Sequence, residues 1–441
     1  MSIGENDTNR TTVDYRNIRD HMTTLPPALV PSLLPSLADI EAARQRIAPY
    51  IPVTPLSVAT SISETLGRTV SFKWDNKLRT GSFKERGALN FLLSMDPQAR
   101  SKGVIAASAG NHALGVSFHA NRLSVPCHLV MPVNAPLVKV ESCRAFGAKI
   151  TLHGTLSDSI THAKEIAQKE GTTYLPPFDH LFTVCGQGVA GLELLEQDSN
   201  FDSVIIPIGG GGYAAGIATA IKAKRPDVFV LGVCSEWALG ARNHIGPHTH
   251  PIPPSTIADG IAVKTIGAVT GPILDQHLDS LVAVSERSIA KAIIKLLEHE
   301  HVVVEGAGAA GFAALLDGYL PDKYKKPVVM ICGSNGEHSL LLLSKDGKKV
   351  ANCVLEHTGS LGVDLILHGG YGTGSRRCIS GKDFRVATAL GNVVRGPHKR
   401  PNLLIYRVYR DGANWSNATL SQAPSEVGNP ALCNSATISP P

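Results

Sequence analysis

Short apolar runs alternate with segments of helical periodicity between about residues 53 and 345 of the chain. Runs of four to seven residues bounded by turn residues predict strands, and apolar positions recurring every three or four residues predict helices. The predicted strands are Val70–Trp74, Gly103–Ala107, Cys127–Met131, Lys149–Leu152, Ser203–Pro207, Val228–Val233 and Val328–Cys332. Predicted helices include one that begins near Ser36, Ser157–Glu170 and Ala214–Lys224. This alternation predicts an α/β fold with two lobes, each an open, mostly parallel sheet flanked by helices.

The pattern weakens at both ends of the chain. Residues 1–27 are polar and lack apolar periodicity, which predicts a flexible N-terminal arm. From residue 346 to 441 the sequence is rich in Ser, Asn and Pro, so we expect an atypical, poorly ordered tail with a few short strands such as Leu403–Val408. The chain between them divides into a large lobe, 28–102 with 181–345, and a small inserted lobe, 103–180.

Composition narrows the class of protein. The 441 residues are 43% hydrophobic and 18% charged, as in globular proteins. The net charge of +5 comes from scattered Lys and Arg residues, so no nucleic-acid partner is expected. No apolar run is long enough to span a membrane. Eight cysteines without a CxxC pair indicate free thiols in a reducing, cytoplasmic location, with a mitochondrial one left open.

A lysine at a predicted helix start is the first candidate for chemistry. Lys84 stands in the segment Thr-Gly-Ser-Phe-Lys-Glu-Arg-Gly-Ala, residues 80–88. Positive backbone potential at a helix start, together with burial, favours the neutral amine that imine formation needs. Two interpretations are open for this lysine, a reactive amine and an exposed helix residue. Phe83 is likewise either a stacking partner for an aromatic cofactor ring or an ordinary core residue.

Three further segments follow Lys84 along the chain, at residues 108–112, 209–212 and 332–335. Gly209, Gly210, Gly211 and Gly212 come after a buried strand and precede a helix, so their N–H groups can converge on an anion such as a phosphate. Ser108, Ala109, Gly110, Asn111 and His112 also lie between a strand and a helix and suit a carboxylate. His112 is either a general base or a packed helix histidine. Cys332 ends a buried strand before Gly-Ser-Asn and offers a thiol to a ring nitrogen.

The four segments, in this order, resemble those of fold-type II pyridoxal-phosphate enzymes, and of the threonine/serine dehydratase (ammonia-lyase) family in particular. Other stretches agree: Thr54-Pro55-Leu56, Gln187-Gly188, Ile257–Val263 and Glu305–Ala310. The resemblance covers about residues 38–345. It implies β-elimination of L-threonine or L-serine to a 2-oxo acid and ammonia, in a homodimer or homotetramer.

The resemblance also implies roles for single residues. Lys84 would hold the cofactor pyridoxal 5'-phosphate covalently and, once released, act as the catalytic base. The other cofactor-binding residues would be Phe83, Asn111, Gly209, Gly210, Gly211, Gly212, Tyr213 and Cys332. The substrate would be bound by Ser108, Ala109, Gly110, Asn111 and His112.

The chain departs from its relatives at several positions. Ala109 stands where serine racemases of this family carry a serine, which disfavours racemisation. Glu236 matches an acidic ligand of a divalent-cation site in some relatives, but Arg242 falls where a second acidic ligand is expected, so no metal is predicted. The tail beyond residue 346 does not resemble the regulatory domain of biosynthetic threonine dehydratases.

Several alternatives stay open at this point. A threo-3-hydroxyaspartate ammonia-lyase differs only in pocket residues that the sequence does not assign, and a serine racemase-like enzyme shares the same segments. A β-replacement enzyme is disfavoured by the residues of the lysine and asparagine loops. A catalytically silent protein that binds pyridoxal phosphate is the alternative from another class.

Overall fold

A computed structural model describes residues 34–242 and 256–335, together with five strands outside those ranges. The chain forms two compact units, Met1–Gly336 and Glu337–Pro441. In the second unit, β12 (His338–Leu343) pairs with β13 (Lys349–Leu355), and β14 (Cys378–Ser380) pairs with β15 (Ser416–Ala418), both antiparallel. The predicted strand Leu403–Val408 lies outside the described residues.

The first unit contains a seven-stranded sheet in the order β1-β10-β9-β8-β11-β3-β2. Its strands are β1 (Thr12–Asp14), β2 (Leu56–Val58), β3 (Ser71–Trp74), β8 (Ser203–Pro207), β9 (Phe229–Ser235), β10 (Ser280–Val284) and β11 (Pro327–Ile331). The five inner strands are parallel, and the edge strands β1 and β2 are antiparallel to their neighbours. The carboxyl ends of the adjacent strands β8, β11 and β3 therefore meet at one edge, where ligands bind in open α/β sheets.

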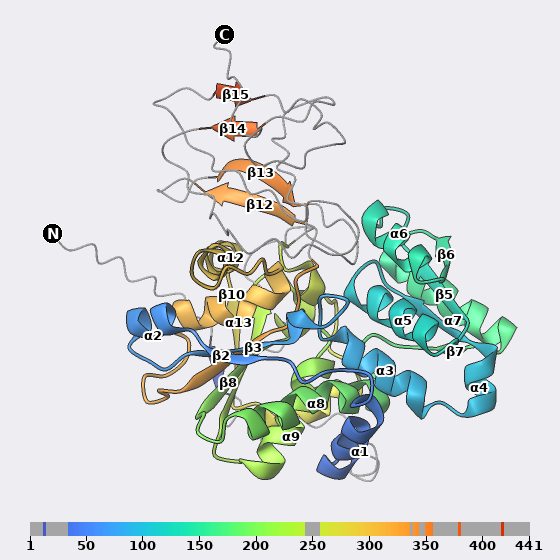
Figure 1. Cartoon of the computed structure of the whole chain (residues 1–441), viewed down its shortest axis with the longest axis horizontal. Coiled ribbons are helices and arrows are strands. Elements are labelled where there is room, and N and C mark those ends of the chain that lie inside the picture. The colour runs from blue at the N-terminus through green and yellow to red at the C-terminus, as the bar shows by residue number, and fades with distance from the viewer. Residues whose placement is uncertain are drawn as a thin grey trace, which may run out of the picture. The chain divides into compact units, whose positions relative to one another are not determined.

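A second, four-stranded parallel sheet has the order β6-β5-β4-β7. Its strands are β4 (Val104–Ala107), β5 (Cys127–Met131), β6 (Lys149–Leu152) and β7 (Thr173–Tyr174). In Figure 1 these strands gather with α5, α6 and α7 at one side of the first unit. The prediction of mostly parallel sheets flanked by helices is confirmed, and the short strands β2 and β7 were not predicted.

Helices connect the strands in both sheets. They are α1 (Leu37–Ile47), α2 (Thr60–Leu66), α3 (Lys84–Ser94), α4 (Pro97–Lys102), α5 (Asn111–Arg122), α6 (Leu137–Ala145), α7 (Leu156–Glu170), α8 (Leu181–Gln197), α9 (Gly212–Lys224), α10 (Leu239–Arg242), α11 (Thr270–His277), α12 (Glu286–Glu300) and α13 (Gly306–Leu316), with 3-10 turns η2 (Asp75–Lys77) and η3 (Asp259–Ile261). Capping boxes at Ser36 and Thr155 start α1 and α7 by satisfying free N–H groups.

The predicted N-terminal arm contains one described element. Residues 12–14 form β1, which pairs antiparallel with β10 at the edge of the large sheet. The rest of the arm, residues 1–11 and 15–27, lies outside the described residues.

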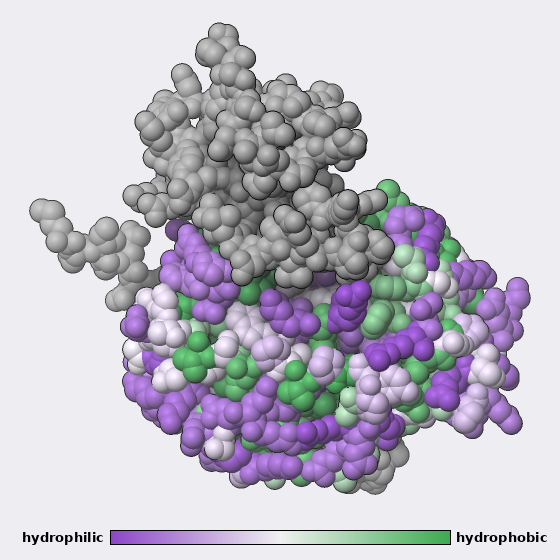
Figure 2. Space-filling view, in the orientation of Figure 1, coloured by the Kyte–Doolittle hydropathy of each residue, from purple (hydrophilic) through white to green (hydrophobic). Residues whose placement is uncertain are grey.

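Each sheet of the first unit has its own apolar core. The inner strands of the large sheet are continuous buried runs, as in β8 and β11, because helices cover both faces. The small sheet packs a separate cluster that includes Leu129, Met131 and Val116. On the face shown in Figure 2, hydrophilic side chains cover most of the first unit and apolar patches lie between them. The two sheets are therefore stabilised by separate sets of apolar side chains.

Candidate functional site

Lys84 lies at the first position of α3, which follows β3 and η2. Its Nζ donates a hydrogen bond to the carbonyl oxygen of Pro177 at 2.9 Å and lies 5.0 Å from the centre of the Phe83 ring. Burial lowers the pKa of Lys84 to about 8, although Cys332 and Glu305 oppose this effect. The predicted preference for a neutral amine therefore has a physical basis in the desolvation of the ammonium.

The loop before Lys84 is joined to the segment after β11. Ser82 forms a β-bridge with Gly333, and the Phe83 N–H donates to the carbonyl of Cys332 at 3.0 Å. Gly81 has a left-handed φ of +75°, and a Cβ at this position would lie 2.6 Å from the Asn335 side chain. These contacts hold Cys332 beside Lys84. Burial and the nearby Glu305 raise the pKa of the Cys332 thiol well above its usual value, so it is a neutral group.

The glycine run lies between β8 and α9. Gly211 has a left-handed φ of +96°, and a Cβ on Gly210 would come within 2.4 Å of the Phe178 ring, so only glycines fit this turn. The helix α9 begins at Gly212, two residues earlier than predicted, and its first N–H groups are free of intrahelical partners. The Tyr213 hydroxyl donates to Asp75 at 2.8 Å, and its ring centre lies 4.1 Å from that of Phe83.

The asparagine loop comes from the small sheet. Ser108 follows β4, and its Oγ accepts a hydrogen bond from the Gly110 N–H at 3.1 Å. Ala109 stands beside it on the same turn, and Asn111 begins α5. The Asn111 Nδ2 donates to Glu305 Oε1 at 2.8 Å, while its buried Oδ1 has no hydrogen-bond partner among the described residues.

His112 is buried, and its Nε2 lies 3.0 Å from the carbonyl oxygen of Leu175, to which it donates. Burial and the charge of Lys84 lower the pKa of His112 to about 3. The ring is therefore neutral, and its Nε2 is committed to a backbone partner. This environment favours the interpretation of His112 as a packed helix histidine.

Glu305 lies beside these residues. The sequence analysis named it only as part of the stretch Glu305–Ala310 and predicted no role for it. It precedes α13 and is 2% exposed. Its carboxylate accepts hydrogen bonds from Asn111 Nδ2 and from the Asn335 N–H, both at 2.8 Å. Burial and the nearby Asp259 raise the pKa of Glu305 to about 7. Glu305 thus connects the asparagine loop to the cysteine segment, and no spacing in the sequence indicates this contact.

Asp179 is a second residue without a predicted role. Its carboxylate accepts hydrogen bonds from the N–H groups of Ala268 at 2.9 Å and Val269 at 2.8 Å, at the start of α11. The hydroxyl of Thr270 on the same helix donates to the carbonyl of Gly210 at 2.6 Å. Asp179 therefore fixes the helix that supports the glycine run.

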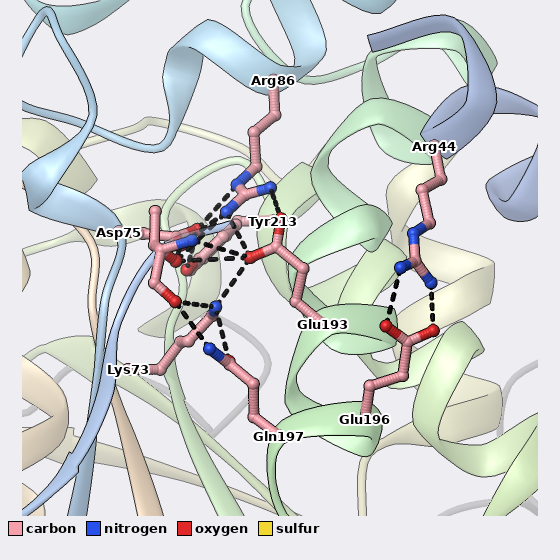
Figure 3. A network of polar contacts seen from close by, with 9 residues as sticks. Arg44, Lys73, Asp75, Arg86, Glu193, Glu196, Gln197 and Tyr213 are labelled. Atoms are coloured by element: carbon pink, nitrogen blue, oxygen red, sulfur yellow. Dashed lines mark hydrogen bonds and ion pairs between the residues drawn. The ribbon is translucent and has the colours of Figure 1, made fainter. Parts of the chain in front are cut away.

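A buried charge network lies behind the site, formed by Lys73, Asp75, Arg86, Glu193 and Tyr213 (Figure 3). Arg86 donates to Asp75 at 2.9 Å and to Glu193 at 2.6 Å, and Lys73 donates to Glu193 at 2.6 Å. Burial alone would raise the pKa of Asp75, but the charges of Arg86 and Lys73 hold it below its usual value. The network joins α3, which carries Lys84, to α9, which follows the glycine run.

The residues around Lys84 fit a cofactor with an aldehyde, a polar aromatic ring and a phosphate. Lys84 offers an amine of lowered pKa, and the glycine turn with the start of α9 offers N–H groups for an anion. Three buried polar atoms around the lysine have no partner within the described part of the chain: Asn111 Oδ1, Ser82 Oγ and Thr80 Oγ1. Because buried polar atoms are normally paired, these atoms indicate a place for a polar ligand.

The predicted absence of a metal rested on Glu236 and Arg242. The Glu236 carboxylate accepts a hydrogen bond from the Glu286 N–H at 3.4 Å. Within residues 34–242 and 256–335, no group of three or more His, Cys, Asp or Glu side chains is arranged to hold a metal ion.

The fold and this set of residues define a two-lobed α/β protein with a site for pyridoxal phosphate. The chain belongs to the family of pyridoxal-phosphate dependent enzymes, which it matches over residues 47–333. It is 38% identical to the L-threonine ammonia-lyase of Thermotoga maritima over 337 residues, which is 74% of this chain and 84% of that protein. It is 42% identical to the catabolic L-threonine dehydratase TdcB of Escherichia coli K12 over 306 residues, 68% of this chain and 93% of that protein.

A solved structure of similar fold is the crystal structure of the threonine deaminase from T.th. It superposes with a TM-score of 0.63 at 37% identity, covering 68% of this chain and 98% of that one. The predicted family and fold class are confirmed, and so is the predicted cofactor.

The helices in the described parts of the chain are short or carry polar residues along their length. None of them has the length and apolar character needed to cross a bilayer.

Proposed function

We propose that the chain is an ammonia-lyase that removes water from L-threonine or L-serine and yields a 2-oxo acid and ammonia. The observation that carries the proposal is Lys84, whose amine of lowered pKa lies among unpaired polar atoms at the edge where β3, β11 and β8 end. The named activities of the two relatives, both acting on L-threonine, support the same reaction.

In this proposal Lys84 holds the cofactor and then acts as the base. With a pKa of about 8, roughly one tenth of the free amine is neutral at pH 7, against about one part in three thousand for a lysine of pKa 10.5. The neutral amine would accept the α-proton of the substrate, and the ammonium so formed would return a proton to the β-hydroxyl, which leaves as water. One water would then hydrolyse the resulting enamine to a 2-oxo acid and ammonia. The bound cofactor supplies an electron sink for the charge that develops at the α-carbon.

The remaining roles are those that the resemblance to the family implies, and the contacts described above support them. Phe83 would pack against the cofactor ring, and the second N–H of the Asn111 amide would be available to a ring oxygen because the first is donated to Glu305. The phosphate would be held by N–H groups of Gly209, Gly210, Gly211, Gly212 and Tyr213. The neutral Cys332 thiol would be the partner of the ring nitrogen, and a neutral partner would leave that nitrogen free of a proton.

The substrate is held by the turn from Ser108 to His112, with N–H groups at the start of α5 facing its carboxylate. Ala109 has no hydroxyl that could deliver a proton to the opposite face of the substrate. This residue supports elimination over a two-base racemisation.

Assembly and organisation belong to the proposal as well. We infer a homodimer or homotetramer in the cytoplasm, with a large lobe of residues 28–102 and 181–345 and a small lobe of 103–180. The separate four-stranded sheet from β4 to β7 supports this division.

The test begins with the absorbance spectrum of the purified protein. L-threonine, L-serine and L-threo-3-hydroxyaspartate are then added separately, and 2-oxo acid is measured. We expect a yellow protein that forms oxo acid from L-threonine or L-serine. A yellow protein inert to all three substrates would contradict the lyase proposal and favour a silent binding protein, and turnover of the hydroxyaspartate alone would reassign the substrate.

The matched variants are Lys84→Ala and Lys77→Ala. Both remove a lysine from the same stretch of chain, but Lys77 is exposed at η2. Lys84→Ala is expected to abolish both the yellow absorbance and turnover, and Lys77→Ala to retain them. Turnover by Lys84→Ala would contradict the assigned base.

A further inference from the structure

Lys139 is a buried lysine that neither the sequence pattern nor the mechanism above uses. It lies in the first turn of α6, on the small-sheet side of the site, and is 8% exposed. Lysine is rarely buried to this degree unless it is paired. Its Nζ lies 4.0 Å from Asp259 Oδ2 in η3, on the large-sheet side. The ammonium thus lies between the two sheets, where the site is.

The nearest part of the substrate-binding turn is Gly110. A Cβ built on Gly110 would lie 3.9 Å from Lys139 Nζ, and no other described heavy atom outside its chain neighbours comes within 4 Å of that point. The space beside Gly110 is therefore open, with an ammonium at its far side. The N–H groups that begin α5 are at the same place. Two independent features, a helix start and a buried cation, favour an anion there.

Asp259 leaves the ammonium of Lys139 able to donate hydrogen bonds to another group. A separation of 4.0 Å exceeds the range of a direct hydrogen bond, about 2.7–3.2 Å, so the three donors of the ammonium are not fixed by Asp259. The carboxyls on which the charge of Lys139 acts are Glu305 and Asp259, and burial raises the pKa of both. Lys84 and the neutral His112 are the other titratable groups of the site. An anionic ligand beside two carboxyls requires a cation. Lys139 is such a cation, because its positive charge acts on both carboxyls and lowers the pKa of each.

We propose that Lys139 binds the α-carboxylate of the amino-acid substrate, together with the turn from Ser108 to His112. This inference rests on the proposed function, since it names a further ligand for the substrate of that reaction. In this arrangement Asp259 is the ion-pair partner of Lys139 when no substrate is bound, and it makes no contact with the substrate.

A structural role for Lys139 makes a different prediction. If the Lys139–Asp259 pair only joined the two sheets, then removing either partner would break the same contact with the same result. If Lys139 binds the substrate, removal of the cation weakens binding, whereas removal of Asp259 takes away a negative charge that competes for it. The two variants therefore separate the two roles.

The experiment uses the holoenzyme and the variants Lys139→Met, Lys139→Arg and Asp259→Asn. L-alanine, which lacks a β-leaving group, and L-alaninamide, which lacks the carboxylate, are titrated while the absorbance of the bound cofactor is followed. For Lys139→Met we expect a loss of L-alanine affinity of roughly 10- to 100-fold, with L-alaninamide unchanged, because a charge-assisted contact to the carboxylate is removed. Lys139→Arg should recover most of the affinity, and Asp259→Asn should not weaken it.

Two results would overturn the inference: an L-alanine affinity of Lys139→Met equal to that of the wild type, or equal losses in Lys139→Met and Asp259→Asn for both ligands. If Lys139→Met does not fold, then the ratio of acid to amide affinity in Asp259→Asn decides: binding by Lys139 predicts a rise in that ratio because a competing negative charge is removed, and a purely structural pair predicts no change. Oxo acid formation from L-threonine by the wild type is measured in parallel. Its absence contradicts the proposed reaction, while the dependence of L-alanine binding on Lys139 is judged separately.

Discussion

Two buried polar regions of the first unit differ in how completely their groups are paired. In the charge network of Figure 3, Arg86 and Lys73 both have carboxylate partners, and the Tyr213 hydroxyl donates to Asp75. Around Lys84, by contrast, Asn111 Oδ1 and Ser82 Oγ are buried without a partner in the described residues. The network contains more charged groups, but among the described residues only the region around Lys84, of the two, has buried polar atoms left to bind a ligand.

This difference indicates what distinguishes a structural polar cluster from a functional one. In the network, each buried charge is compensated, as a stable interior requires. At the site, Lys84 has a pKa of about 8 and Glu305 a pKa of about 7, so both groups titrate near neutral pH. Burial is the largest cause of both shifts. A search for charged residues alone would select the network, whose charged groups are paired.

The largest expected effect is the loss of stability in Arg86→Met. Removing this guanidinium leaves the carboxylates of Asp75 and Glu193 buried without their main partner, which costs about 3–5 kcal/mol. Urea unfolding of the cofactor-free protein, followed by circular dichroism, measures the difference.

The matched control for this variant is Arg44→Met. Arg44 also makes a two-pronged contact with a glutamate on α8, Glu196, but this pair is at the surface, with side-chain exposures of 34% and 54%. Such pairs contribute about 0–1 kcal/mol. Similar losses in Arg44→Met and Arg86→Met would contradict the view that burial gives the network its importance.

How much of this could be predicted from the sequence depends on the range of the contacts. The strands Cys127–Met131, Lys149–Leu152 and Ser203–Pro207 were predicted to the residue, because apolar runs bounded by turns are local signals. The strand β10 was missed, since the predicted pattern contained no strand between residues 234 and 327.

The same limit applies to the site. The lysine loop, the asparagine loop, the glycine run and Cys332 could be predicted as candidates because each is a short motif next to the start of a helix or the end of a strand. Glu305 received no role because its partner Asn111 is 194 residues away in the chain. Lys139 and Asp259 were missed for the same reason, since their pairing depends on how the two sheets pack and not on any spacing.

The next largest effect is expected in the pH dependence of stability of the cofactor-free protein. Glu305 has a pKa of about 7 in the folded protein, against an ordinary value of 4.5. Its stabilising contribution is therefore present in full below pH 4.5 and is lost as the pH rises through 7, an effect of up to about 3 kcal/mol. In Glu305→Gln this part of the pH dependence should vanish, as urea unfolding at several pH values between about 5 and 8 would measure.

Glu196→Gln is the control for Glu305→Gln, because Glu196 is an exposed carboxylate whose pKa is lowered by its hydrogen bond with Arg44. The free energy of unfolding of Glu196→Gln should depend on pH in the same way as that of the wild type over this range. If the Glu305→Gln curve also ran parallel to that of the wild type, then the carboxyl would titrate near its ordinary value and the site would be less desolvated than its burial indicates.

The smallest effect is expected for Cys332→Ser. The backbone carbonyl of Cys332 accepts the Phe83 N–H, and this contact is independent of the side chain. A hydroxyl, like the thiol of raised pKa, is a neutral partner for a ring nitrogen, so the exchange should change kcat for L-threonine by less than about tenfold, the range of one neutral hydrogen bond. Cys332→Asp introduces a carboxylate at the same position and should reduce kcat more strongly. Equal activity of the two variants would show that the charge at position 332 is unimportant and would contradict the proposed role of Cys332 as the neutral partner of the ring nitrogen.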